Sequence, residues 1–142
     1  MKDATAESNK ALYRSFIDEV FNLGKVDKVN EYLSADYQLR DAPPGAPNGR
    51  DSVVAIVQMF RRAFPDLKIV VEEQIAEGNL VSSRTVTRGT HKGEIFDTQP
   101  SNKLISVPGL TMVKIVDGRI TESSVKNDMI ALLKQIGATK VP

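Results

Sequence analysis

The spacing of apolar residues divides the chain into a helical first part and a strand-rich second part. Residues 8–23 place apolar side chains every three or four positions, which is typical of a helix with one broad buried face. After Pro65 this spacing gives way to alternation and β-branched runs, so the strands between 67 and 126 are expected to form one bent antiparallel sheet. On the same grounds, helices are expected over 8–23, 26–33, 51–63 and 128–136.

The stretch from Lys103 to Asp128 predicts a hairpin that leads directly into the last helix. Asp117-Gly118 lies between two strand-like runs, and glycine adopts positive φ without a Cβ clash, so this dipeptide predicts a tight turn. The second strand, 120–126, is rich in polar residues and ends just before Asp128. A carboxylate at the end of a long strand is held more rigidly than one on a loop, which makes Asp128 the first functional candidate.

Helices and strands that are segregated along the chain predict an α+β fold and not alternating β-α-β units. We expect residues 1–142 to form a single domain, in which a strongly bent sheet wraps around the helices and leaves a cone-shaped interior. A short first strand, Tyr37 to Asp41, runs into the loop 42–49, whose prolines and glycines exclude regular structure. Such loops often border a binding site.

The composition excludes several classes of function. The net charge is +1 and the longest basic run is Arg61-Arg62, so neither nucleic acid nor an anionic membrane is an expected partner. No apolar run approaches the roughly 20 residues of a membrane span. With no cysteine, one histidine and no nucleotide-binding glycine motif, neither a cofactor nor a multi-histidine metal site is expected. The lack of cysteine and of an apolar leader in MKDATAESNK favours the cytoplasm.

Several segments, spread over nearly the whole length, together form a recognisable pattern. They are NLGKVDKVNEYLSADY, GRDSV followed by AFPDL, EGNLVSSRTVTRGTHKGE, TQPSNKLISVPG, IVDGRITES and NDMIALLKQIG. In this order they resemble the SnoaL-like polyketide cyclase (ester cyclase) family of the nuclear-transport-factor-2-like superfamily. The resemblance implies a cone-shaped α+β barrel, a homodimer formed through the sheet, and a cofactor-free pocket for a small hydrophobic substrate. It also implies that Asp128 is the acid/base in an intramolecular aldol ring closure.

Asp128 has two interpretations. An Asp directly before an apolar helix is a favourable N-cap, but the resemblance favours the acid/base role. Glu122, Ser124 and Lys126 share its strand parity, so this polar face looks either into a wet pocket or at solvent. We predict that the carboxylate points into the cavity, where partial desolvation raises its pKa toward neutral pH. The following helix is expected to close one end of the barrel with Ile130, Leu133 and Ile136.

Asp41 and His91 are the other candidates for catalysis. Asp41 has the placement of the general base of ketosteroid isomerases, which share this superfamily, but a turn-initiating Asp before proline is the interpretation we favour. Ile17 and Thr111 stand where the isomerases need a phenol and an acid, so that oxyanion hole is not expected. His91, in GTHKG, is expected at an exposed, glycine-flanked bend, with a place on the pocket rim as the alternative.

A second group of residues is predicted to bind substrate. Its apolar and aromatic members are equally consistent with a plain hydrophobic core. Arg84, on a long strand, is placed to pair with a buried carboxylate. The group comprises Tyr37, Phe60, Arg84, Phe96, Met112 and Ser124.

The sequence therefore predicts an enzyme that uses a carboxylate acid/base on a carbonyl substrate, either an aldol-type cyclase or a related isomerase. The alternative is a non-catalytic module of the same fold that binds a ligand or forms a dimer. Ser123-Ser124 stands where relatives often carry His-Trp before the acid, and this difference favours the module.

Overall fold

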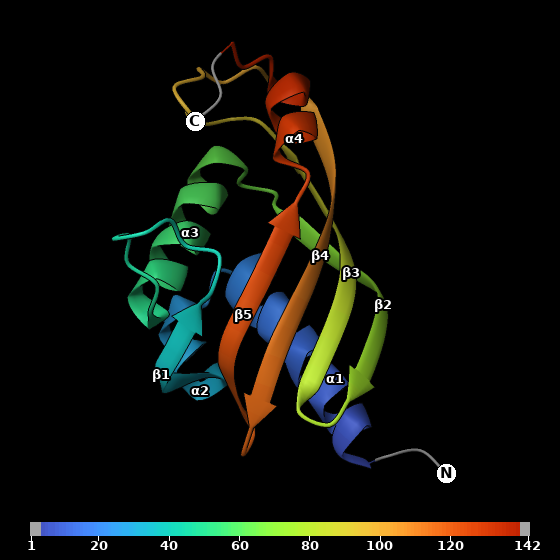
Figure 1. Cartoon of the computed structure of the whole chain (residues 1–142). Helices are drawn as coiled ribbons and strands as arrows, with labels where there is room; N and C mark the ends of the chain where they lie inside the picture. Colours follow the sequence, from blue (N-terminus) through green and yellow to red (C-terminus); the bar gives the residue numbers. More distant parts are fainter. Residues whose placement is uncertain (1–3, 140–142) are drawn as a thin grey trace.

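The computed structural model describes residues 4–139, which form a curved five-stranded sheet with helices packed against its concave side (Figure 1). The helices are α1 (Ala4–Phe16), α2 (Val29–Tyr32), α3 (Arg50–Ala63) and α4 (Met129–Ile136). The strands are β1 (Leu33–Leu39), β2 (Lys68–Glu77), β3 (Leu80–Thr90), β4 (Leu104–Val116) and β5 (Arg119–Asn127). The architecture is the α+β fold that the sequence predicts.

The strand order β1-β5-β4-β3-β2 places β1 and β2 at the two edges of an open sheet. The strands β2 to β5 pair antiparallel, as predicted. β1 instead runs parallel to β5, so the whole sheet is mixed. β1 also begins four residues earlier than the predicted Tyr37, at Leu33, because Leu33 is fully buried and draws the chain onto the sheet directly after α2.

The first predicted helix, 8–23, contains two kinds of helix. After α1 the chain continues as a π-helix over Ile17–Asn22. The guanidinium of Arg61, on α3, donates hydrogen bonds to the carbonyl oxygens of Phe21 and Asn22 at 3.0 and 2.8 Å. These bonds satisfy carbonyl groups that the end of a helix leaves without an intrahelical partner.

The remaining helices lie close to their predicted ranges. The range 26–33 holds a 3₁₀ turn at Val26–Lys28 and then the single turn of α2. α3 and α4 each begin within one residue of the predicted start. Gly137 ends α4 in the left-handed conformation, with φ of 79°, which glycine adopts without a Cβ clash.

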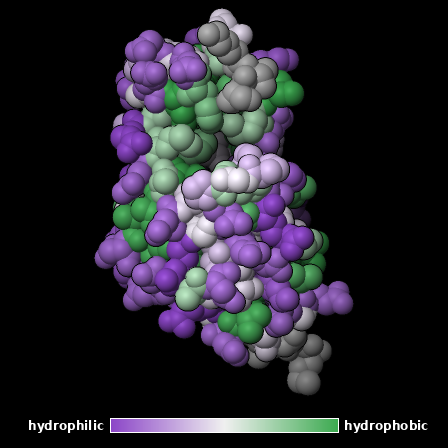
Figure 2. Space-filling view, turned by 60° about the vertical axis from the view of Figure 1, so that its left-hand side comes forward, coloured by the Kyte–Doolittle hydropathy of each residue, from purple (hydrophilic) through white to green (hydrophobic). Residues whose placement is uncertain are grey.

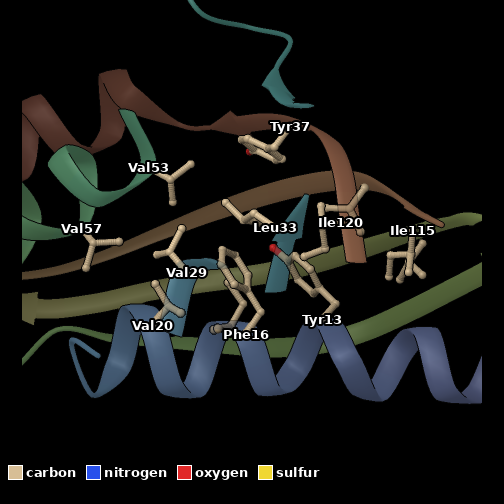
Figure 3. Close-up of a cluster of buried hydrophobic side chains, with 13 residues drawn as sticks. Tyr13, Phe16, Val20, Val29, Leu33, Tyr37, Val53, Val57, Ile115 and Ile120 are labelled. Atoms are coloured by element: carbon tan, nitrogen blue, oxygen red, sulfur yellow. The ribbon is translucent and has the colours of Figure 1, made fainter. Parts of the chain in front are cut away.

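Two clusters of buried side chains hold the helices against the sheet. In the larger cluster, Tyr13 and Phe16 project toward the sheet from α1, and Val20 does so from the π-helix that continues it (Figure 3). The smaller cluster joins the ends of α3, β4 and α4 through residues such as Phe64, Ile105 and Ile136. The buried face of α4 consists of Leu132, Leu133 and Ile136, whereas Ile130 is 64% exposed, so its predicted place in the core is wrong.

Alternation along β4 defines the two faces of the sheet. Odd-numbered positions from 105 to 115 are buried, whereas even-numbered positions from 104 to 112 are exposed. Of the buried positions, Ile105, Val107, Val113 and Ile115 belong to the two clusters beneath the helices, so the exposed positions lie on the outer face. Within residues 4–139, no helix is long and apolar enough to span a membrane.

Candidate functional site

A cavity of about 350 Å³ lies between the helices and the concave face of the sheet. Figure 2 shows a hollow on the side of the molecule that carries α3 and β1, with hydrophobic surface beside it. Most of the cavity wall is aromatic or aliphatic, as is usual for a site that binds a small apolar molecule. The apolar lining includes Phe16, Phe21, Leu39, Val53, Ile56, Met59, Phe60, Leu67, Ile69, Phe96, Ile105, Val107, Val113, Val125, Met129 and Leu132.

A few polar side chains from separate elements reach the same cavity. Tyr13 comes from α1, Tyr37 from β1, and Ser123 and Asn127 from β5. Burial raises the pKa of Tyr13 to about 12, outweighing the nearby Thr111 hydroxyl, which lowers it. Burial likewise raises the pKa of Tyr37, and the Ser123 hydroxyl lowers it in part. Both phenols therefore stay neutral at physiological pH and act as hydrogen-bond donors.

Asn127 owes its place on the wall to a glycine on the neighbouring strand. Gly109 pairs with Asn127 on one side and with Thr85 on the other. A Cβ at Gly109 would overlap with Asn127 Oδ1 and would lie 3.1 Å from Thr85 Oγ1. The Asn127 carboxamide therefore occupies the space that a side chain on β4 would otherwise fill.

Asp128 does not point into the cavity, so that prediction is wrong. Its Oδ1 accepts a hydrogen bond from the Ala131 amide at 3.0 Å, which makes Asp128 the N-cap of α4, and the residue is exposed. The cavity is lined instead by its two neighbours, Asn127 and Met129.

The polar residues of β5 with the parity of Asp128 lie on one face, and the structure shows that this face looks at solvent. Glu122 forms an ion pair with Arg40 at 2.9 Å, and Lys126 forms one with Asp41 at 3.3 Å. Strand alternation then turns Ser123 and Val125 inward, and these residues reach the cavity.

Asp41 has a structural position at the edge of the sheet. Its Oδ2 accepts a hydrogen bond from the Val125 amide at 2.6 Å. β1 ends at Leu39, which pairs with Ser123. Beyond that point, the Asp41 side chain replaces the strand as the hydrogen-bond acceptor for β5. Asp41 is exposed and is not part of the cavity lining, which agrees with the turn interpretation that the sequence favours.

His91 is fully buried, contrary to the expected exposed bend. Its Nδ1 accepts a hydrogen bond from the Ser101 amide at 3.1 Å, and its ring centroid lies 5.7 Å from that of Phe64. With Nδ1 as acceptor, the neutral ring carries its proton on Nε2, which has no hydrogen-bond partner among residues 4–139. His91 thus connects the start of the 91–103 loop to its end and does not line the cavity.

The predicted substrate-binding residues divide between the two faces of the sheet. Tyr37, Phe60 and Phe96 line the cavity, and the rings of the two phenylalanines meet edge to face at 6.3 Å. The others lie on the outer face: Met112 is 49% exposed, Ser124 pairs with it across the strands, and Arg84 forms an ion pair with the exposed Glu73. These last three therefore do not contact a ligand in the cavity.

Sequence reasoning missed Tyr13, Ser123 and Asn127 as wall residues. Tyr13 lies within the predicted helix 8–23, where nothing local distinguishes a cavity wall from the core. Ser123 and Asn127 have the opposite strand parity to Asp128, so they lie on the other face of β5. Alternation identifies this second face, and choosing it as the inner one would have predicted both residues.

A second hollow of about 540 Å³ lies on the surface, bordered by the ends of β3 and β4 and by α4. It is more open than the cavity, and its lining includes Asp66, Arg88 and Gln135. The Asp66 carboxylate is already bonded to the amide and hydroxyl of Thr90, at 2.7 and 2.8 Å, and these bonds lower its pKa. Among residues 4–139, no cluster of His, Cys, Asp or Glu is arranged to hold a metal ion.

Comparison with known proteins assigns the chain to a family. The sequence model of the SnoaL-like polyketide cyclases matches residues 11–136, and the chain belongs to this family. Nogalonic acid methyl ester cyclase of Streptomyces nogalater is 30% identical over 120 residues, covering 82% of this chain and 89% of that protein. Aklanonic acid methyl ester cyclase DnrD of Streptomyces peucetius is 25% identical over 122 residues, covering 84% of each chain.

Solved structures agree with this assignment. Wild-type IdmH of Streptomyces antibioticus superposes with a TM-score of 0.79 at 29% identity, covering 92% of this chain and 99% of that one. TsrD of Streptomyces laurentii has a TM-score of 0.83 at 21% identity, covering 97% of this chain and 99% of that one, and this likeness concerns the fold alone.

Proposed function

We propose that this chain is a cyclase that binds a hydrophobic, polyketide-derived carbonyl compound and closes a ring in it by an intramolecular aldol reaction. The observation that carries the proposal is the cavity of about 350 Å³, whose apolar wall holds a few neutral hydrogen-bond donors. Such a site suits a flat, oxygen-bearing carbon skeleton. Membership of the SnoaL-like polyketide cyclase family supports the same reaction class.

The reaction needs one group that takes a proton and later returns it. A base removes a proton from the carbon next to one carbonyl, the resulting carbanion forms a carbon–carbon bond to a second carbonyl, and the new alkoxide receives a proton. No atom is lost, and no oxidant or reductant is required. General acid/base catalysis by a positioned carboxylate typically contributes about 10²–10⁴-fold in rate.

We propose Asp128 as this base. Its neighbours Asn127 and Met129 both line the cavity, so the Asp128 backbone lies at the cavity edge. To reach a bound substrate, its carboxylate must give up the hydrogen bond from Ala131 and rotate inward. The N-cap arrangement is therefore the resting state, and the substrate supplies the competing contact.

The test is a cyclisation assay with nogalonic and aklanonic acid methyl esters, the compounds named in the relatives, followed by chromatography. Asp128→Asn and Asp128→Ser both remove the carboxylate and keep a capping oxygen. We expect both to fold normally and to lose turnover by about a hundredfold or more. Asp41→Asn is the matched control, because it removes a nearby carboxylate that accepts a hydrogen bond from the Val125 amide of β5 and does not line the cavity. Loss of turnover in Asp41→Asn alone would contradict the assignment to Asp128.

One observation favours the alternative, a ligand-binding module without catalysis: among the described residues, no carboxylate side chain lines the cavity. Calorimetry with the same two esters separates the two functions. Tight binding with no cyclised product from the wild-type chain would support the module, and cyclised product would exclude it.

We also propose that two copies of the chain pair through the outer face of the sheet. Leu110 and Met112 are 58% and 49% exposed there, and Val86 lies opposite Pro108 on the adjoining strands. This apolar strip is not covered within the chain, and a second copy would bury it. Light scattering should return twice the 15.6 kDa chain mass.

The control for dimerisation compares two exposed apolar residues. Leu110→Glu places a charge in the centre of the strip and should give a monomer. Ile130→Glu changes an exposed residue on α4, at 64% exposure, and should leave the dimer intact. A monomeric mass for the wild type at micromolar concentration would contradict the proposal.

A further inference from the structure

Three hydroxyl-bearing side chains, those of Tyr13, Tyr37 and Ser123, line the cavity, and a fourth, that of Thr111, is buried next to Tyr13 without lining it. Tyr37 on β1 is adjacent to Ser123 on β5, and Tyr13 on α1 is adjacent to Thr111 on β4. Because Tyr13 and Tyr37 line the same cavity, one ligand can contact both phenols. Figure 3 shows Tyr13 reaching from α1 toward the sheet, with Tyr37 on the opposite side of the same cluster of buried side chains.

These hydroxyls are buried, and one of them lacks a hydrogen bond. Each of Tyr13, Tyr37, Thr111 and Ser123 is at most 6% exposed. Thr111 Oγ1 is near the Tyr13 phenol but does not reach hydrogen-bonding geometry with it, and it has no hydrogen-bond partner among residues 4–139. An unsatisfied buried hydroxyl costs about 1–3 kcal/mol, so the Tyr13 and Tyr37 phenols on the cavity wall favour a ligand oxygen that accepts their protons over an apolar group.

The chemistry of the group selects one kind of ligand atom. The side chains that act on the two phenols are hydroxyls, and a hydroxyl has one proton to donate. In an apolar, water-poor cavity, neutral donors stabilise a negative oxygen far more than they do in bulk water. A cation would gain less, because no carboxylate side chain among the described residues lines the cavity.

We propose that the Tyr13 and Tyr37 hydroxyls bind the ligand oxygen that carries negative charge, as an enolate or phenolate. Ser123 and Thr111 position the two phenols. The inference rests on the proposed function, because the oxygen in question is the one on which charge develops when the base removes a proton next to a carbonyl. Tyr13 and Tyr37 are then catalytic hydrogen-bond donors, and the cavity accepts oxygenated aromatic or polyketide skeletons in preference to plain hydrocarbons.

The third tyrosine supplies a matched control. The Tyr32 hydroxyl donates a hydrogen bond of 2.5 Å to the Glu19 carboxylate and does not line the cavity. Tyr32→Phe therefore makes the same chemical change as Tyr13→Phe and Tyr37→Phe, at a place where no ligand binds.

The experiment uses 2-naphthol, whose neutral and ionised forms have different absorption spectra. The pH at which the bound naphthol is half ionised is measured in the wild-type chain and in the three Phe variants. Naphthol ionises below the tyrosine range, so Tyr13, with a pKa of about 12, stays protonated throughout. We expect half-ionisation to move up by about one pH unit in Tyr13→Phe and in Tyr37→Phe, equivalent to about tenfold weaker preference for naphtholate. Tyr32→Phe should leave the value unchanged.

Equal half-ionisation in all four proteins would overturn the inference, and so would failure of the folded wild type to bind naphthol. Where a Phe variant is unstable, Ser123→Ala gives the second test, because it removes only the hydroxyl beside Tyr37. The pH of half-ionisation of bound naphthol should then move up as well, but by less than in Tyr37→Phe. The cyclisation assay is read separately. If the naphthol titration shifts in the variants but no cyclised product forms, the oxygen-binding site is supported and the cyclase function is rejected. If cyclised product forms but the titration does not shift, the cyclase function is supported and the oxygen-binding site is rejected.

Discussion

The Oδ1 atom of Asp128 accepts a hydrogen bond from the Ala131 amide at 3.0 Å, which fixes the start of α4 at the edge of the cavity. The residue proposed as the base therefore also stabilises the helix that closes one end of the interior. Substitutions that keep or remove the capping oxygen separate the two roles.

The capping role predicts a difference between two substitutions that both remove the carboxylate. Asp128→Ala leaves the Ala131 amide without its acceptor and should lower the free energy of unfolding by about 0.5–2 kcal/mol. Asp128→Ser keeps a capping oxygen and should lose less than half of that. Urea denaturation of the two variants measures both values, and equal losses would show that the cap contributes little.

The tyrosines predict a specific pH dependence. The pKa values of Tyr13 and Tyr32 are raised to about 12, and that of Tyr37 is raised as well. The pKa of these tyrosines is higher in the folded chain than the value of about 10 in the unfolded chain. The protonated phenols therefore contribute their full stabilisation below about pH 10, and this contribution is lost as the pH rises through about 12. Ultraviolet titration should show little tyrosinate near pH 10 in the folded chain and about half ionisation in urea. Half ionisation near pH 10 in the folded chain would contradict the burial of Tyr13.

Asn22 links the π-helix to β2 through two side-chain hydrogen bonds. Its side chain donates to the Ile69 carbonyl at 3.0 Å and accepts from the Ile69 amide at 2.7 Å. Asn22→Ala should destabilise the chain by about 1–3 kcal/mol, because two partly buried backbone groups lose their partner. It should also weaken ligand binding, since Phe21 and Ile69 both line the cavity. Asn30→Ala, at an exposed position of α2, is the control, and an equal effect there would refute the assignment.

Gly109 predicts a change in the cavity without loss of the fold. In Gly109→Ala the new Cβ meets Asn127 Oδ1, the end of a flexible side chain, so the carboxamide swings away and the backbone stays in place. We expect thermal stability close to that of the wild type, together with a shifted side-chain amide resonance of Asn127 in NMR spectra. Gly118→Ala is the contrasting variant, because Gly118 has φ of 76° and open space around it, so that substitution strains the backbone and leaves the cavity unchanged. An unmoved Asn127 resonance in Gly109→Ala would contradict the overlap.

Local pattern was sufficient for most of the secondary structure. The helices containing 51–63 and 128–136, the Asp117-Gly118 turn and the antiparallel order of β2 to β5 depend on contacts between residues near in sequence. The parallel pairing of β1 with β5 joins residues more than eighty positions apart, as in Leu39 with Ser123, and no local signal encodes it.

The sequence by itself determined which residues of β5 share a face, because side chains alternate along any strand. Only the tertiary structure decided which face is inside, since that depends on where α1, α3 and α4 pack. The same packing buries His91 against Phe64 and brings Tyr13, Tyr37 and Ser123 from three elements to one cavity wall. Periodicity assigns a residue to a face of its own element, whereas a site is formed where faces of distant elements meet, and that arrangement is a property of the folded chain.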